Sequence, residues 1–111
     1  EEHLESGHAT SRRALDRIVA APDVSIEDLS KSLGSSRGEL SRRVHRDWGV
    51  PLVELRARTK LMRFIRAVDA GQEFTRAALD ADFGSYAQCH RVFQRVLRCS
   101  PSQYVRLAKK G

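Results

Sequence analysis

The sequence predicts an all-α fold of about seven helices, arranged as two similar halves on either side of a long central helix. Three observations support this prediction. Apolar residues recur at spacings of three and four along most of the chain, and no segment shows the alternation typical of strands. Glycine and proline stand at the ends of these helical segments, and serine stands at several of their starts. The second half of the chain also repeats the pattern of the first half.

In the first half, residues 1–9 are polar and are expected to form a disordered tail or linker. Ser25 and Ser36 are each followed three positions later by an acidic residue, which is the spacing of a helix capping box. Gly34 and Gly49 stand where the two helices that begin at these serines are expected to end. The helices expected in this half span residues 10–21, 25–34 and 36–49.

A long helix is expected from Pro51 to about Ala70, with Leu61, Met62 and Ile65 facing inward and Gly71 ending it. The aromatic residues Trp48, Phe64, Phe83 and Phe93 are interpreted as core residues. Further helices are expected over residues 74–81, 85–97 and from 100 onward. The expected organisation is therefore a tail (1–9), a first subdomain (10–49), a linker helix (50–71) and a second subdomain (72–111).

An internal repeat relates the two subdomains. At a shift of 49 residues, the chain aligns Leu40 with Cys89, Arg42 with Arg91, Val44 with Phe93 and Arg46 with Arg95. The preceding short helices align at a shift of 48, with Gly34 on Asp82, so the second turn is one residue longer. Each half is thus a short helix, a tight turn and a longer basic helix, which is the helix-turn-helix pattern.

The composition agrees with a nucleic-acid-binding surface. Lys and Arg number 20 and Asp and Glu number 14, which gives a net charge of +6, and no acidic side chain follows Asp82. A solvated basic surface remains the alternative interpretation. No apolar run is long enough for a membrane span. The chain lacks a Ser/His/Asp set, paired carboxylates and a glycine-rich phosphate loop, so neither an enzyme nor a cofactor is expected.

The two cysteines, Cys89 and Cys99, are too few for a disulfide framework, so free thiols in a reducing cytoplasm are expected. Together with His90 they are the one metal-like set, but Cys89 lies on the apolar side of its helix and is interpreted as a packed thiol. No metal site is therefore expected. A thiol switch at either cysteine is kept as a further hypothesis.

In a helix-turn-helix unit the second helix enters the major groove, so its polar side must carry the groups that contact DNA. Arg42 and Arg91 are candidates for reading bases, although ordinary surface arginines are the alternative. Gln88 is interpreted either as a reader of adenine or as a residue that only completes the cap at Ser85. Tyr86 is interpreted either as a contact to a sugar or a thymine methyl or as a residue that only covers the turn. Phosphate contacts are expected at the helix starts and along the basic side, from Ser36, Arg37, Arg46, Ser85 and Arg95.

The expected linker helix has 20 residues and would span ~30 Å at ~1.5 Å per residue. Successive major grooves on one side of DNA lie ~34 Å apart, so a monomer is expected to read an asymmetric site with both units. If the two grooves do not line up with the units, the DNA is expected to bend. Basic residues crowd this helix and are interpreted either as a solvated face or as a contact for polymerase or another domain. They are Arg56, Arg58, Lys60, Arg63 and Arg66.

At these residues the chain resembles the AraC/XylS family of bacterial transcription regulators, over about residues 12–106. The segment "DFGSYAQCHRVFQRVLRCSPSQY" resembles the family signature through Phe83, Arg91, Phe93, Ser100, Pro101 and Tyr104. In the first unit the matching residues are Leu29, Gly34, Ser36, Leu40, Arg42 and Gly49. The resemblance implies a homeodomain-like fold and base contacts from residues Gly38, Ser41, Arg42, Tyr86, Ala87, Gln88 and Arg91. Departures from the pattern include Asp82 and Arg98, which replace glycines, and Val105, which replaces an arginine.

The function expected from these observations is sequence-specific binding of double-stranded promoter DNA in the bacterial cytoplasm. RNA polymerase is expected as a further partner. The chain begins with Glu1 rather than Met, which indicates a piece of a longer protein, although a removed tag or processing would look the same. An effector or dimerisation domain is expected N-terminal to it. The alternative is a helical interaction module whose basic face binds an acidic protein. The operator, the regulated genes, the direction of control, any effector and the oligomeric state are not predicted.

Overall fold

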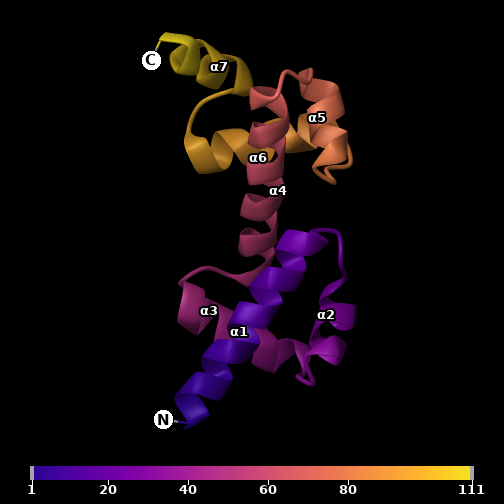
Figure 1. The fold of residues 1–111 in the computed structure, drawn as a ribbon, viewed down its shortest axis with the longest axis vertical. Coiled ribbons are helices and arrows are strands. Elements are labelled where there is room, and N and C mark those ends of the chain that lie inside the picture. Colours follow the sequence, from indigo (N-terminus) through magenta and orange to yellow (C-terminus); the bar gives the residue numbers. More distant parts are fainter. Residues whose placement is uncertain (1, 111) are drawn as a thin grey trace. The chain divides into compact units, whose positions relative to one another are not determined.

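The computed structural model describes residues 2–110, and within that range it shows seven α-helices and no strand (Figure 1). The expected all-α fold is therefore confirmed. Side chains are described for residues 9–109. The helices are α1 (Glu2–Ala20), α2 (Ile26–Ser32), α3 (Arg37–Trp48), α4 (Leu52–Asp69), α5 (Phe74–Asp80), α6 (Tyr86–Leu97) and α7 (Pro101–Lys110).

The N-terminal segment differs from the expected tail over residues 1–9. Helix α1 begins at Glu2 and runs without interruption to Ala20, so residues 2–9 are helical, while residue 1 lies outside the described part. This segment contains Gly7 but no proline, and one glycine weakens a helix by only about 1 kcal/mol relative to alanine. Polarity alone therefore did not show where this helix begins.

The chain folds into two compact units, Glu1–Thr59 and Lys60–Gly111, which we call unit 1 and unit 2. Helix α4 contributes its first part to unit 1 and its second part to unit 2. The segment that we expected as a separate linker between two subdomains is thus shared between the units. Each unit is described on its own below.

Unit 1 is built around α3, which packs against both α1 and α2. Its core consists of aliphatic side chains that are buried completely or nearly so: Ala14, Ile18, Leu29, Leu40, Val44 and Leu52. Trp48, which we expected in this core, is instead 41% exposed, and its indole N–H donates to the Ser11 carbonyl at 3.3 Å. Ser11 also donates from its hydroxyl to Asp47 Oδ2 at 2.6 Å, so polar contacts join α1 to the end of α3.

Unit 2 is built around α6, which packs against α5 and α7. Its core is richer in aromatic rings than that of unit 1. Phe93 is fully buried, and its ring lies 5.8 Å from the ring of Phe64 and 5.8 Å from that of Tyr104, edge to face in both cases. Around these rings lie Leu61, Ala77, Ala78, Ala81, Phe83 and Cys89. Met62 is 57% exposed, so its expected inward position is wrong.

The turns that join the short helices to α3 and α6 use left-handed residues at equivalent positions. Gly34 has a φ of 67° in unit 1, and Asp82 has a φ of 69° in unit 2. After the longer helices, Gly49 (φ 76°) and Arg98 (φ 61°) take the same conformation as C-caps. The aligned backbones therefore share their left-handed positions, although only unit 1 places glycine there.

Candidate nucleic-acid interface

The start of α3 is fixed by Ser36. Its Oγ accepts the backbone N–H of Glu39 at 3.2 Å, and its hydroxyl donates to Glu39 Oε1 at 3.1 Å. Buried Leu40 and Val44 hold one side of the helix against the core. The predicted contact residues Arg37, Gly38, Ser41, Arg42 and Arg46 are all exposed. In unit 1 every predicted contact residue of α3 is thus open to solvent.

Arg42 lies over Gly38. A Cβ added at Gly38 would come within 3.3 Å of an Arg42 guanidinium nitrogen. The missing side chain at Gly38 therefore gives the Arg42 side chain room toward the start of α3, which is the part of a recognition helix that enters the major groove. Gly38 itself has no side chain with which to read a base.

The two other arginines of α3 that were predicted to contact DNA have acidic neighbours. Arg37 lies 3.8 Å from Glu27, and both side chains are well exposed, so the pair contributes little to stability. The Arg46 Nε lies 3.0 Å from Asp47 Oδ1, and Asp47 is nearly buried and also accepts from Ser11. Arg46 is thus anchored at its Nε by the network that joins α1 to α3.

The start of α6 is fixed in a similar way. The Ser85 Oγ accepts the Gln88 N–H at 3.1 Å, and the Gln88 Oε1 accepts the Gly84 N–H at 2.7 Å. Of the two interpretations of Gln88, the structure therefore favours the cap. Ala87, Arg91 and Arg95 lie on the exposed side of α6.

Tyr86 is also engaged within unit 2. Its ring stacks on Phe74 with centroids 5.7 Å apart and an interplanar angle of 17°, and it meets His90 edge to face at 5.9 Å. Partial burial, together with the nearby Cys89, raises the pKa of the Tyr86 hydroxyl. The structure thus favours the interpretation that Tyr86 covers the core beside the turn.

The basic side chains of α4 make contacts within their own units. In unit 1, Arg56 donates to the Val24 carbonyl, and Arg58 Nε lies 3.2 Å from a Glu54 oxygen. In unit 2, Lys60 lies 5.9 Å from the centre of the Phe83 ring, and Arg63 lies 3.5 Å from Asp82. Four of the five basic residues singled out in this helix therefore have structural partners.

The cysteines are free thiols in different surroundings. Cys89 is buried in the core of unit 2, and this burial raises the pKa of its thiol to about 12, whereas Cys99 is partly exposed. Among residues with described side chains, no group of three or more His, Cys, Asp or Glu is arranged to hold a metal ion. Within the same part of the chain, no helix is long and apolar enough to cross a membrane.

Sequence reasoning missed two residues beside the exposed side of α3. His45 is exposed four positions after Ser41, so it lies on the same side of the helix. Asp47 holds the Arg46 side chain. The spacing of four would have indicated His45, whereas no sequence signal distinguishes Asp47 from an ordinary surface carboxylate.

Both units hold a short helix, a tight turn and a longer helix with exposed arginines, which defines the class of helix-turn-helix DNA-binding domains. A family model described as a helix-turn-helix domain, of the AraC type, matches residues 29–107. The chain belongs to this family, as the resemblance indicated. It is therefore a DNA-binding domain of a kind that regulates transcription and is typically not enzymatic. Comparisons with curated proteins and with solved structures found no significant match.

Proposed function

We propose that this domain binds double-stranded promoter DNA sequence-specifically, with α3 and α6 in adjacent major grooves, and so regulates bacterial transcription. The observation that carries the proposal is the exposure of Arg42 and Arg91 at equivalent positions of two helices whose opposite sides are packed into their units. An arginine in the major groove pairs with the O6 and N7 of guanine through two hydrogen bonds.

The other contact residues are assigned around these two arginines. Ser41 is exposed one residue before Arg42 and supplies a hydroxyl to the neighbouring base. Ala87 offers its methyl group to a thymine methyl. Tyr86 and Gln88 contact the DNA only through atoms that their packing and cap contacts leave exposed.

Phosphate contacts are assigned to the starts of α3 and α6 and to other arginines of these two helices. The amides that follow Ser36 and Ser85 point out of the starts of α3 and α6, where an anion is favoured. Arg37, Arg46 and Arg95 contribute charge, which adds affinity without sequence preference. Binding should therefore weaken steeply as the salt concentration rises.

The test begins with selection of binding sites from a random DNA library, followed by mobility shifts with the selected duplex. Arg42→Ala and Arg91→Ala should each weaken binding by about 1–3 kcal/mol and relax the preference at one base pair. Arg12→Ala is the matched control, because Arg12 is an exposed arginine of α1 outside both second helices. If both variants keep the affinity and the base preference of the parent, the assigned reading residues are wrong.

The use of two grooves is tested through spacing within the selected site. Insertion of ~5 base pairs between its two halves turns one half to the opposite side of the duplex, since a helical turn has ~10. Affinity should then fall to that of a duplex with one intact half. Unchanged affinity after the insertion would show that one unit alone reads the site.

A wider setting follows from this proposal. The domain would act in the cytoplasm beside RNA polymerase and receive its signal from an effector or dimerisation domain N-terminal to it. The alternative function, a basic module that binds an acidic protein, is favoured by the same charge. Unlabelled genomic DNA added as competitor separates the two, because only a sequence-specific DNA binder keeps its selected duplex under excess competitor.

A further inference from the structure

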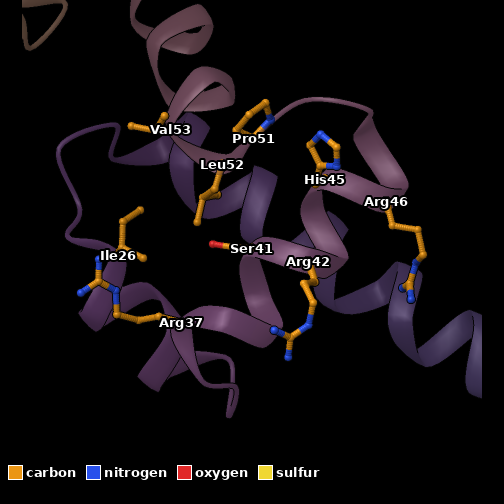
Figure 2. A pocket seen from close by; sticks show the side chains of 9 residues that line it. All are labelled: Ile26, Arg37, Ser41, Arg42, His45, Arg46, Pro51, Leu52 and Val53. Carbon is orange, nitrogen blue, oxygen red and sulfur yellow. The ribbon is translucent and has the colours of Figure 1, made fainter.

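Unit 2 carries a groove of about 650 Å³ beyond the end of α6, between the turn that follows this helix and α7. It is lined by Arg98, Cys99, Gln103, Arg106, Leu107 and Lys109. None of these residues is assigned to DNA. A groove of about 600 Å³ in unit 1 differs in this respect, because Arg37 and Arg42 line it and point to its opposite ends (Figure 2). The groove of unit 2 is therefore a surface that the proposed function does not use.

Helix α7 packs with one side and leaves another side open at the groove. Pro101 is fully buried, and the Tyr104 ring meets the buried Phe93 ring edge to face at 5.8 Å. Arg106 and Leu107 are exposed, and the Leu107 side chain keeps 64% of its surface open to solvent. The position of the groove wall is thus fixed by the packing behind it.

The groove is positively charged. Arg98, Arg106 and Lys109 are exposed, and within the described part of the chain no ion pair or side-chain hydrogen bond engages their charged groups. No acidic side chain follows Asp82 in the sequence, so the neighbouring chain segment supplies no counter-charge. A segment that carries carboxylates is the electrostatic complement of such a surface.

Arg98 holds one of these charges in an unfavourable backbone conformation. Its φ of 61° is left-handed, which glycine adopts without penalty and an arginine does not. The turn after α6 therefore keeps a guanidinium at the groove although glycine would fit this backbone better. This conflict makes the function of Arg98 separable from its effect on stability.

DNA phosphates do not account for the groove. Phosphate contacts are made by hydrogen-bond donors and charge, whereas an exposed leucine gains only by contact with another apolar group. Helix α6 has 12 residues, so Arg98 lies ~18 Å along the helix from Tyr86 at ~1.5 Å per residue. Because the start of a recognition helix is the part that enters the major groove, this surface lies at the other end of α6.

We propose that the groove docks an acidic segment of a partner protein that also carries a large aliphatic side chain. Separate carboxylates of the segment pair with Arg98, Arg106 and Lys109, so these cations need not converge on one group. The aliphatic side chain lies on Leu107 and supplies most of the affinity, because exposed ion pairs contribute little. This docking leaves the start of α6 free and does not depend on DNA binding.

The binding is tested by fluorescence anisotropy with a labelled peptide of sequence EELLEELLEE. We expect saturable binding at one site. The peptide QQLLQQLLQQ lacks the charge and EESSEESSEE lacks the leucines, so each should bind at least about tenfold more weakly. If either control binds as tightly as the first peptide, charge and apolar contact are not both needed and the proposal is wrong.

The position of the bound peptide is tested in the unchanged protein through Cys99. This thiol lines the groove and is partly exposed, whereas Cys89 is buried. Iodoacetamide is neutral and so does not itself compete for the cations. Its reaction with Cys99 should slow in proportion to the fraction of protein that has bound EELLEELLEE. An unchanged rate at saturation would place the peptide elsewhere and overturn the proposal.

Two variants separate binding from folding. Arg98→Gly should bind the peptide at least about threefold more weakly although it relieves the left-handed arginine, so the loss does not come from unfolding. Leu107→Ser should bind about tenfold more weakly. Leu79→Ser is the matched control, because Leu79 is a half-exposed leucine of unit 2 that does not line the groove. Parent affinity for the peptide in both Arg98→Gly and Leu107→Ser would refute the assignment.

Other occupants are distinguished by charge reversal. Arg106→Glu should weaken peptide binding at least about fivefold and leave the affinity for the selected duplex within about threefold, whereas Arg91→Glu should do the reverse. If Arg106→Glu instead loses the duplex and keeps the peptide, the groove contacts phosphate and the proposal is wrong. A dimeric parent that Leu107→Ser makes monomeric in sedimentation would place a second copy there, which also overturns it. If the protein binds no duplex, the proposed function fails while the peptide titration still decides the groove.

Discussion

The second helices of the two units align residue by residue, yet they use their exposed residues differently. On α3, Ser41 and Arg42 lie on the exposed side. On α6, the Tyr86 ring packs on Phe74 and the Gln88 oxygen caps the helix, so Arg91 is the main long side chain left at the equivalent position. Duplication of a helix-turn-helix backbone therefore does not duplicate the side chains that are left exposed at the start of its second helix.

The cores of the two units also differ. Unit 1 is held by aliphatic side chains and a polar contact between α1 and α3, whereas unit 2 is held by a cluster of aromatic rings. The rings that stabilise unit 2 include Tyr86 from the start of its second helix. Position 86 is therefore used for packing in unit 2, whereas the aligned residue of unit 1, Arg37, is exposed. The following predictions test this difference, from the largest expected effect to the smallest.

Phe93→Ala should lower the free energy of unfolding of unit 2 by about 3–5 kcal/mol, because the buried ring contacts two other rings. Its counterpart Val44→Ala should cost unit 1 about 1–3 kcal/mol, since a smaller side chain is lost. Amide hydrogen exchange measured separately for α3 and α6 checks both values. Equal losses in the two units would contradict the difference between the cores.

Asp47→Ala should destabilise unit 1 by about 1–3 kcal/mol, because it leaves the hydroxyl of buried Ser11 without its carboxylate partner at 2.6 Å. The position aligned with Asp47 is Val96, which packs on the core of unit 2, so no polar contact is lost there on truncation. Denaturant unfolding measures the change. Recovery of the parent stability in Ser11→Ala/Asp47→Ala, with both partners removed, would be the expected control result.

Arg98→Gly should stabilise unit 2 by about 0.5–1 kcal/mol. Arg98 has a φ of 61°, a conformation that costs a side-chain-bearing residue about 1–2 kcal/mol, part of which is offset by the greater unfolded-state entropy of glycine. The reciprocal change Gly49→Ala should destabilise unit 1. Asp82→Gly should gain less, since it also removes the ion pair with Arg63. Thermal melting of the three variants and the parent measures the order of their stabilities.

The two thiols should differ in reactivity and in their effect on stability. Ellman's reagent should label Cys99 in the folded protein and Cys89 only after unfolding. Because burial raises the pKa of Cys89 from 9.0 to about 12, the neutral thiol stabilises the fold fully below pH 9, and this contribution is lost as the pH rises toward 12. Unfolding between pH ~8 and ~11, compared with Cys89→Ala, measures that loss. If the free energy of unfolding falls equally with pH in the parent and in Cys89→Ala, this prediction is wrong.

Much of the fold follows from local signals in the sequence. The serines at 36 and 85 cap the helices that they were expected to cap, and the longer second turn places Asp82 in the left-handed conformation. These features depend on groups within a few residues of one another, so spacing alone reveals them. The assignment to AraC-type domains is confirmed by the family model, which matches residues 29–107.

The wrong predictions of burial concern residues whose angular position around the helix lies near the boundary between the buried and the exposed side. Residues spaced by four drift ~40° per step around a helix, so Trp48 lies ~80° from Leu40 and reaches the edge of the core. Met62 lies ~200° from Phe64 on α4 and therefore faces away from the ring cluster. The roles of Tyr86 and Gln88 depended on neighbours in three dimensions, Phe74 and Gly84, which helical spacing does not rank.

The position of Arg42 over Gly38 has a consequence for how the specificity of this domain changes in evolution. In the proposed complex, a larger residue at position 38 would bring its own side chain toward the DNA, and the Arg42 guanidinium, 3.3 Å from the added Cβ, would have to shift by a few tenths of an ångström. If both positions contact bases as proposed, one substitution at 38 is expected to change the contacts of both. Variant libraries built to retarget unit 1 should randomise both codons at once.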